Sequence, residues 1–229
     1  MAIDYTKRPK SASTPPAAGQ GAPVSLQKVT LTKAAPVVSL TKQGSTSGVL
    51  RINLNWNARP GGQGGGIFGH RRAGIDLDLG CLYEFTDGSK GVVQALGNAF
   101  AAGPHGVREP VIWLDGDDRS GANTAGENMF INLAYTAQIR RVLVFALIYA
   151  GVPNWAAADG VVTLYPANGP QVEVRLDETR DGARICGIAM LEAANGDLSV
   201  RREVRYVDGN QSHLDRAYGW GMNWRLGRK

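Results

Sequence analysis

Short segments with apolar residues at every second position recur along most of this chain, and they constrain its fold more than any other feature. The clearest are "VLRINLNW" at 49–56 and "AGIDLDLGCLYEF" at 73–85. Such alternation is typical of a strand that buries one face. Similar segments follow at 91–96, 110–114, 129–135, 141–150, 161–165, 172–176, 183–191 and 198–207.

Tight turns are predicted between many of these strands. Asn or Asp followed by Gly supplies the positive φ that short hairpins need. Such pairs occur at Asp87-Gly88, Asn168-Gly169, Asp181-Gly182, Asn195-Gly196 and Asp208-Gly209. Only 212–224 and 136–141 have a helical pattern. About ten short strands with few helices predict an all-β fold, an antiparallel two-sheet β-sandwich with one or two short helices.

The N-terminal region differs in composition from the rest of the chain. Residues 1–23 are rich in Pro, Ala, Ser and Gly, which predicts a disordered arm. Three similar segments follow, "VSLQK" at 24–28, "VTLTK" at 29–33 and "VSLTK" at 38–42. The first two are expected to pair with the edge of the domain or with a neighbouring molecule, since a strand edge is a template for association. We therefore divide the chain into an arm, 1–36, and a sandwich domain, 37–229, with homo-oligomerisation through residues 24–42 as a hypothesis.

Most of the net charge belongs to this arm. The chain carries a formal charge of +5, and residues 1–36 hold five cations against one acid. A basic arm suits nucleic acid or an anionic membrane surface. Because the cations are spread out, a solubilising leader is favoured over nucleic-acid binding, and peripheral membrane association stays open. No apolar run approaches the roughly 18–20 residues that span a bilayer, and there is no apolar signal-peptide core, so we expect a soluble cytoplasmic protein.

Residues suited to nucleophilic or acid–base catalysis are scattered. Cys81 and Cys186 lie in apolar, strand-like segments and are expected to be buried thiols. The three histidines, His70, His105 and His213, are far apart in sequence. No nucleophile with an adjacent base can be named, so we expect no enzyme.

The glycine-rich segment "RPGGQGGGIFGHRR" at 59–72 superficially resembles a phosphate-binding loop. A P-loop has Lys and Ser or Thr directly after its last Gly and a helix next. Here a strand pattern follows, so a mobile loop between two strands is the favoured interpretation.

Acidic residues gather in two places. Asp76 and Asp78 alternate with the buried positions of 73–85, which puts them on one face about 7 Å apart. In "WLDGDDRSGANTAGEN" at 113–128, Asp115 and Asp117 repeat this spacing, and Asp118 and Glu127 add two acids. If the two strand ends are neighbours, the carboxylates converge beside Gly and Asn residues. Ca²⁺ requires six to eight oxygen ligands of this type.

Three alternatives compete with a calcium site. Zinc is disfavoured because no Cys or His lies within 113–128. A carboxylate pair for glycoside hydrolysis needs one acid in an apolar setting, which this polar loop does not suggest. A solvated turn stabilised by Asx hydrogen bonds remains open.

Four blocks of the sequence resemble the TerD-type tellurium-resistance and general-stress family, most closely its TerA-like branch. The blocks are "VSLTKQG", "IDLDLGCLYEF", "GDDRSGANTAGEN" before "INL", and "VLVFALIYAGVPNWAAADG". The similarity covers about residues 38–175, and its second and third blocks are the specific ones. It implies a β-sandwich that binds Ca²⁺ through its acidic loops.

The resemblance also implies ligands. Asp76 and Asp78 match the family's "DLD", Asp117 matches the Asp of its "GDN", and Asp118 stands in place of the Asn. Glu127 falls on an acidic position of the "GDGDDE" block, where this chain reads "NTAGEN". Asp115 has no clear equivalent. Fewer carboxylates imply weaker Ca²⁺ binding, or one ion where relatives hold two.

We therefore expect a non-enzymatic, calcium-binding stress-response module that docks to partners such as other tellurium-resistance proteins. The alternative is a structural protein that assembles through N-terminal strand addition. The C-terminal "LDRAYGWGMNWR" at 214–225 is interpreted either as a recognition surface or, preferably, as a cover over the open end of the sandwich.

Overall fold

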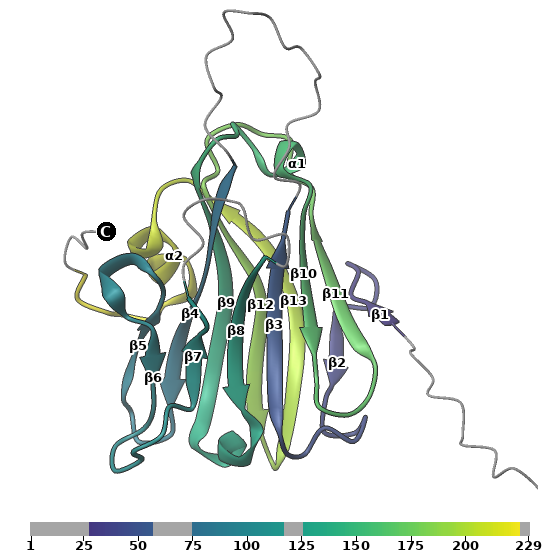
Figure 1. The fold of residues 1–229 in the computed structure, drawn as a ribbon, viewed down its shortest axis with the longest axis vertical. Coiled ribbons are helices and arrows are strands. Elements are labelled where there is room, and N and C mark those ends of the chain that lie inside the picture. Colours follow the sequence, from purple (N-terminus) through teal and green to yellow (C-terminus); the bar gives the residue numbers. More distant parts are fainter. Residues whose placement is uncertain (1–27, 57–74, 117–125, 225–229) are drawn as a thin grey trace, which may run out of the picture.

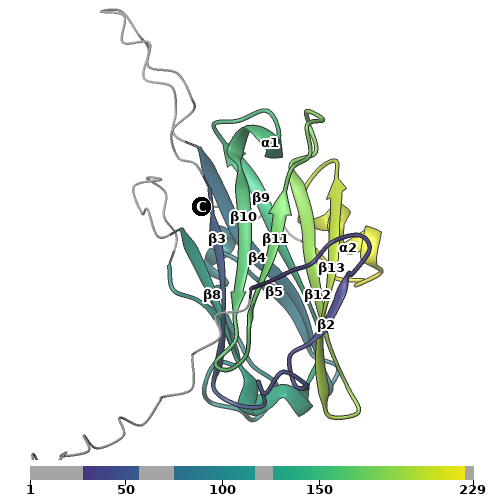
Figure 2. The same ribbon diagram turned by 90° about the vertical axis from the view of Figure 1, so that its right-hand side faces the viewer.

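Two β-sheets packed face to face form the body of the molecule, as predicted (Figures 1 and 2). The computed structural model describes residues 28–56, 75–116 and 126–224. The seven-stranded sheet contains, in spatial order, β1 (Lys28–Thr30), β11 (Gln171–Leu176), β10 (Gly160–Tyr165), β3 (Val49–Asn55), β8 (Glu127–Asn132), β7 (Ile112–Leu114) and β6 (Ala101–Ala102). The six-stranded sheet contains β2 (Val37–Ser39), β13 (Asp197–Val207), β12 (Ile185–Ala194), β9 (Ile139–Ala150), β4 (Asp76–Phe85) and β5 (Lys90–Val93).

Neighbouring strands run antiparallel except for β1, which pairs parallel with β11. The hairpin from β12 to β13 shows how the turn residues act. Ala194 pairs with Asp197, and between them Asn195 and Gly196 have φ values of 52° and 76°. Both residues adopt the left-handed conformation that a two-residue hairpin demands, so the Asn-Gly signal predicted this turn correctly.

The main core lies between the sheets. Leu50, Ile52 and Leu54 of β3 are fully buried there, as the alternation predicts. A second apolar cluster lies on the outer face of the six-stranded sheet, where Leu82, Leu143 and Phe145 pack with Leu214 and Trp220. Because the C-terminal segment covers that face, β4 and β9 are buried on both faces, which one-sided alternation did not predict.

Helices are few and short in the described ranges. They are η1 (Leu96–Asn98), η2 (Leu133–Gln138), α1 (Trp155–Ala158) and α2 (Gln211–Tyr218). The helix predicted over 212–224 is present in its first part as α2, which Asn210 caps. The helix expected over 136–141 is present only up to Gln138, where η2 ends, and β9 begins at Ile139. None of the helices in the described ranges is long and apolar enough to cross a membrane.

The N-terminal segment closes one side of the sandwich. β1 lies at the edge of the seven-stranded sheet, while β2 pairs with β13 at the edge of the other. Leu31, Val38 and Leu40 are buried in the main core. The segment thus pairs with the edges of its own domain, and β1 extends the sandwich upstream of residue 37. The disorder expected for 1–23 and the glycine loop at 59–72 fall outside the described residues.

Candidate metal centre

A buried hydrogen bond joins the two sheets at Glu127, one of the predicted acidic residues. Glu127 is the first residue of β8 and pairs with Leu54 of β3, so its side chain lies on the core side of the seven-stranded sheet. Its Oε2 accepts a 2.7 Å hydrogen bond from the Leu79 amide of β4, in the opposite sheet. The Glu127 carboxylate is therefore fixed against one short stretch of β4.

Asp78 directly precedes this contact. Leu77 and Leu79 point into the core between the sheets, so Asp78 extends from the opposite face of β4. Asp78 is 4% exposed and Glu127 is 3% exposed. Asp76, two residues earlier, is half-buried. Asp76, Asp78 and Glu127 thus lie around the first residues of β4, with Glu127 on the core side of this strand and Asp78 on its outer side.

Asp115 belongs to a different group, on the outer face of the seven-stranded sheet. Successive strand residues point to opposite faces, so Asn128 faces away from Glu127. Asp115 Oδ2 accepts from Asn128 Nδ2 at 2.8 Å, and Asp115 N donates to Asn128 O at 3.1 Å. Asn128 Oδ1 accepts from Asn53 Nδ2 at 3.0 Å. Asp115 is thus hydrogen-bonded to a polar group on β8 and β3 rather than to the Glu127–Leu79 link.

Gly126 fixes the start of β8. Its φ is +73°, and a Cβ at this position would lie 2.1 Å from the Leu54 carbonyl oxygen. Only glycine fits so close to β3 in the left-handed conformation. The close approach sets the position of the next residue, Glu127.

The oxygen atoms in this region are of the type that a hard cation binds. Asp78 and Glu127 supply carboxylate oxygens, which Ca²⁺ prefers. Among the residues that the structure describes, no group of three or more His, Cys, Asp or Glu is placed to hold a metal ion. Asp117 and Asp118, the remaining predicted ligands, lie outside the described residues.

The C-terminal segment is held by a residue that sequence reasoning missed. Asp215 of α2 is 3% exposed and accepts hydrogen bonds from Gly221 N at 2.7 Å, Met222 N at 2.9 Å and Trp224 Nε1 at 2.6 Å. A single Asp inside a helix gives no sequence signal for such a role.

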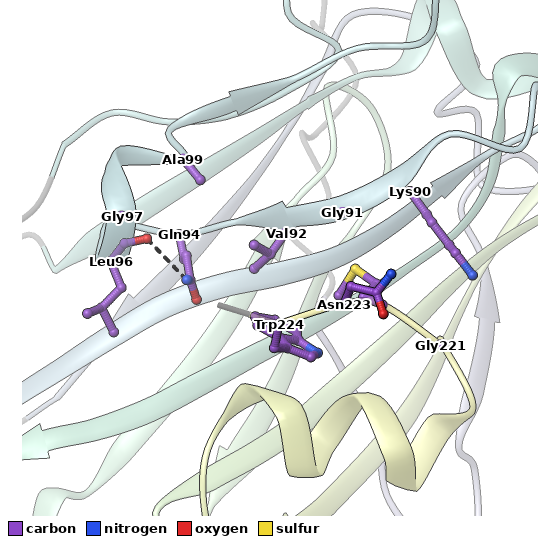
Figure 3. A pocket seen from close by; sticks show the side chains of 11 residues that line it. Lys90, Gly91, Val92, Gln94, Leu96, Gly97, Ala99, Gly221, Asn223 and Trp224 are labelled. Carbon is purple, nitrogen blue, oxygen red and sulfur yellow. Dashed lines mark hydrogen bonds between the residues drawn. The ribbon is translucent and has the colours of Figure 1, made fainter. Parts of the chain in front are cut away.

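The same segment covers a sheet face and borders a groove. Trp220 is 1% exposed, and its Nε1 donates to Tyr83 O at 3.0 Å, so it covers the outer face of the six-stranded sheet rather than the open end of the sandwich. Between this segment and β5 lies a groove of about 500 Å³, bordered by Val92, Leu96 and Trp224 (Figure 3).

The two cysteines and two of the histidines lie in other parts of the fold. Cys81 and Cys186 are free and buried, as predicted, and burial raises the pKa of the Cys81 thiol to about 12. His105 Nδ1 lies 3.0 Å from Asp87 Oδ2 on the surface, while His213 Nδ1 lies 2.9 Å from Asn210 Oδ1 at the start of α2.

Comparisons with known proteins bear on the resemblance. The chain is 47% identical over 208 residues to the tellurium resistance protein TerA of an Alcaligenes species. That match covers 90% of this chain, which spans 60% of the relative's length. A crystal structure of a homologue of the telluride resistance protein TerD from Streptomyces coelicolor A3(2) is similar at 20% identity, with a TM-score of 0.48, over 74% of this chain and 95% of that one. No family model matches the chain.

Proposed function

The chain belongs to the TerD-type tellurium-resistance family, and we propose that it is a non-enzymatic, cytoplasmic stress-response module that binds Ca²⁺ and docks to partner proteins. The name of the Alcaligenes relative refers to tellurium resistance, and other tellurium-resistance proteins are the partners that we propose. The relative is longer than this chain, so the function proposed here is that of the sandwich module.

One observation supports the calcium proposal above the others: the buried Glu127–Leu79 hydrogen bond, which fixes a carboxylate of one sheet against the residue that follows Asp78 in the other. Carboxylate oxygens held in a fixed position are ligands of the kind that Ca²⁺ prefers.

The proposed role of the ion is to order the connection between β7 and β8. That connection contains Asp117 and Asp118 and ends at Gly126 and Glu127. Like charges so close in sequence repel one another at neutral pH. A bound cation would offset this repulsion and prepare the connection for partner docking.

Counting bound ions tests the proposal. Native mass spectrometry of the protein purified in calcium is expected to show at least one Ca²⁺ that is lost on chelation. Replacing Asp117 with Ala should abolish this ion, while Asp4→Ala, in the N-terminal arm, should retain it. An ion count that stays unchanged in Asp117→Ala would reject the proposed ligand set.

A second function, self-assembly, draws support from β1. This strand is three residues long, forms one edge of the seven-stranded sheet and pairs in parallel with β11. The same ladder is available to β1 of a neighbouring copy, because exchange of an identical element is a low-cost route to dimers. Light scattering of the full chain and of a chain that begins at Val37 tests this. The same number of subunits per particle in both chains would dismiss strand exchange.

A further inference from the structure

β5 is the last strand of the six-stranded sheet, so within the described ranges one of its edges has no partner strand. The Phe85 amide donates to the Ser89 carbonyl at 2.8 Å, which makes these two residues a hydrogen-bonded pair next to the turn between β4 and β5. In an antiparallel ladder such pairs alternate with pairs whose N–H and C=O groups point outward. Lys90 and Val92 hold the outward positions of this register and direct their main-chain groups away from β4.

The next outward position, Gln94, is already occupied. Its amide donates to the Ala99 carbonyl at 2.9 Å, in an isolated bridge that precedes β6. At Lys90 and Val92, no hydrogen bond from the described part of the chain reaches the outward N–H and C=O groups. Unpaired main-chain groups along a strand edge are a template for another strand.

The groove of about 500 Å³ lies beside this edge (Figure 3). β5 and η1 form one wall, and residues 221–224 form the other. Val92 and Leu96 on the first wall, and Met222 and Trp224 on the second, are half-buried and belong to the outer apolar cluster. The groove therefore offers apolar surface next to the unpaired main-chain groups, as sites for extended peptides do.

Hydrogen bonds hold the second wall in place. The Asp215 carboxylate accepts three hydrogen bonds from residues 221–224. Lys90 Nζ donates to the Trp220 carbonyl at 2.6 Å, which ties the two walls together at one end of the groove (Figure 3). Because the groove is preformed, a bound peptide does not have to order it.

Lys90 sets the charge of the groove. Of the described residues that line it, Lys90 is the only charged one. Its cross-strand neighbour Glu84 forms ion pairs with Arg140 and Arg141, at 2.8 and 2.7 Å. No carboxylate in the described ranges forms an ion pair with Lys90, whose ammonium contacts the neutral Trp220 carbonyl. A carboxylate complements this charge, whereas a cation is repelled.

We propose that the edge of β5 binds an extended acidic peptide of a partner protein as an added strand. The peptide pairs with the main chain of Lys90 and Val92, places an apolar side chain between Val92 and Trp224, and places a carboxylate at Lys90. The two side chains are two residues apart in the peptide, because Lys90 and Val92 are two residues apart on one face of β5.

This inference rests on the docking role proposed above, for which it names a surface and a partner chemistry. It does not depend on calcium binding, because the groove contains none of Asp76, Asp78 or Glu127.

Nuclear magnetic resonance titration of the full chain, in EDTA and in calcium, tests the groove. The probes are four capped heptapeptides with Thr at every odd position, Glu at the second and sixth, and Leu, Ile, Phe or Trp at the fourth. This arrangement fits either strand direction. We expect at least one peptide to shift the Val92 amide and the Trp224 indole signals saturably, and to slow hydrogen exchange at the Lys90 and Val92 amides.

Two results of this titration would overturn the proposal. The first is no saturable shift with any of the four peptides up to about 1 mM. The second is a shift of the same signals when the protein concentration alone is raised, which would assign the groove to a second copy of the chain. Peptide binding in EDTA that is unchanged in calcium would leave the groove assigned even if no calcium binds.

N-methylated forms of the binding peptide test the strand pairing. Successive N–H groups of a strand point to opposite edges, so only one of the fourth and fifth residues directs its N–H at β5, whichever way the peptide runs. Methylation of that nitrogen should weaken binding by about ten-fold, and methylation of the other should have little effect. Equal affinities of the two methylated peptides would contradict strand addition.

A charge variant tests the position of the carboxylate. The wild type should prefer the Glu peptide over a counterpart with Lys at the same two positions by about five-fold. Lys90→Gln should lose this preference. Lys42→Gln, at an exposed position after β2 on the opposite edge of the same sheet, should keep it. A preference that persists in Lys90→Gln would refute the contact with Lys90.

Discussion

The carboxylate of Glu127 and the amide of Leu79 connect the two sheets through a 2.7 Å hydrogen bond buried at one end of the core. Glu127 therefore has two separable roles. It accepts one backbone hydrogen bond, which any side chain with a suitably placed carbonyl oxygen can do, and it carries the negative charge that the calcium proposal requires.

Two substitutions of Glu127 separate these roles. Glu127→Gln retains an acceptor for Leu79 but not the charge, so it should fold normally and lose most of its calcium affinity. Glu127→Ala removes the acceptor as well and should lower the free energy of unfolding by about 1–3 kcal/mol. Calorimetric calcium titration and denaturant unfolding measure the two effects. Glu192→Gln, whose side chain is 47% exposed, is the control, and equal calcium affinity in Glu127→Gln and Glu192→Gln would count against the ligand role.

Gly126→Ala should be far more damaging than an equivalent change elsewhere. Its Cβ would meet the Leu54 carbonyl oxygen at 2.1 Å, whereas Gly88, with a φ of +84°, has nothing within 4 Å of a Cβ. Both variants carry the penalty of a left-handed conformation, roughly 1–2 kcal/mol. Only Gly126→Ala adds the steric cost of about 1–3 kcal/mol. Urea unfolding of the two variants compares them, and equal losses of stability would show that β8 moves away from β3 without cost.

Asp215→Asn should loosen the C-terminal segment. The carboxylate accepts three hydrogen bonds, and an amide offers one acceptor oxygen in its place. Bonds to a charged group contribute about 1.5–3 kcal/mol each. Hydrogen exchange should therefore accelerate at the Gly221 and Met222 amides. Asp208→Asn, at a position 69% exposed, should leave these amides protected, and unchanged protection in Asp215→Asn would refute the role assigned to Asp215.

The buried Cys81 thiol should make stability fall at high pH. Burial raises its pKa from 9.0 to about 12 in the folded protein. A group with a raised pKa keeps its proton in the folded state, so the unfolded state loses its proton first as pH increases. Stability is therefore lost progressively between pH 9 and pH 12. Replacing Cys81 with Ala should flatten this part of the pH dependence of unfolding, and an unaltered profile would argue against a buried neutral thiol.

The sequence predicted the strands well because their apolar alternation is strong, as in β3. It did not predict that β4 and β9 are buried on both faces, because that depends on where Trp220 and α2 pack. The alternation also predicted that Leu77 and Leu79 point into the core and that Asp78 points away from it. The separation of Asp115 from Glu127 was not, because it depends on Asn128 and Glu127 pointing to opposite faces of β8, a register that sequence spacing alone does not set.

The most direct measurement is a thermal melt of the protein in EDTA and in excess calcium, with Asp78→Asn beside it. A ligand at 100 times its dissociation constant stabilises the folded state by about 2.7 kcal/mol, which should raise the Tm by roughly 5–10 °C for a chain of this size. We expect this rise in the wild type and its loss in Asp78→Asn. Superimposable melts of the wild type in EDTA and in millimolar calcium would contradict the calcium proposal.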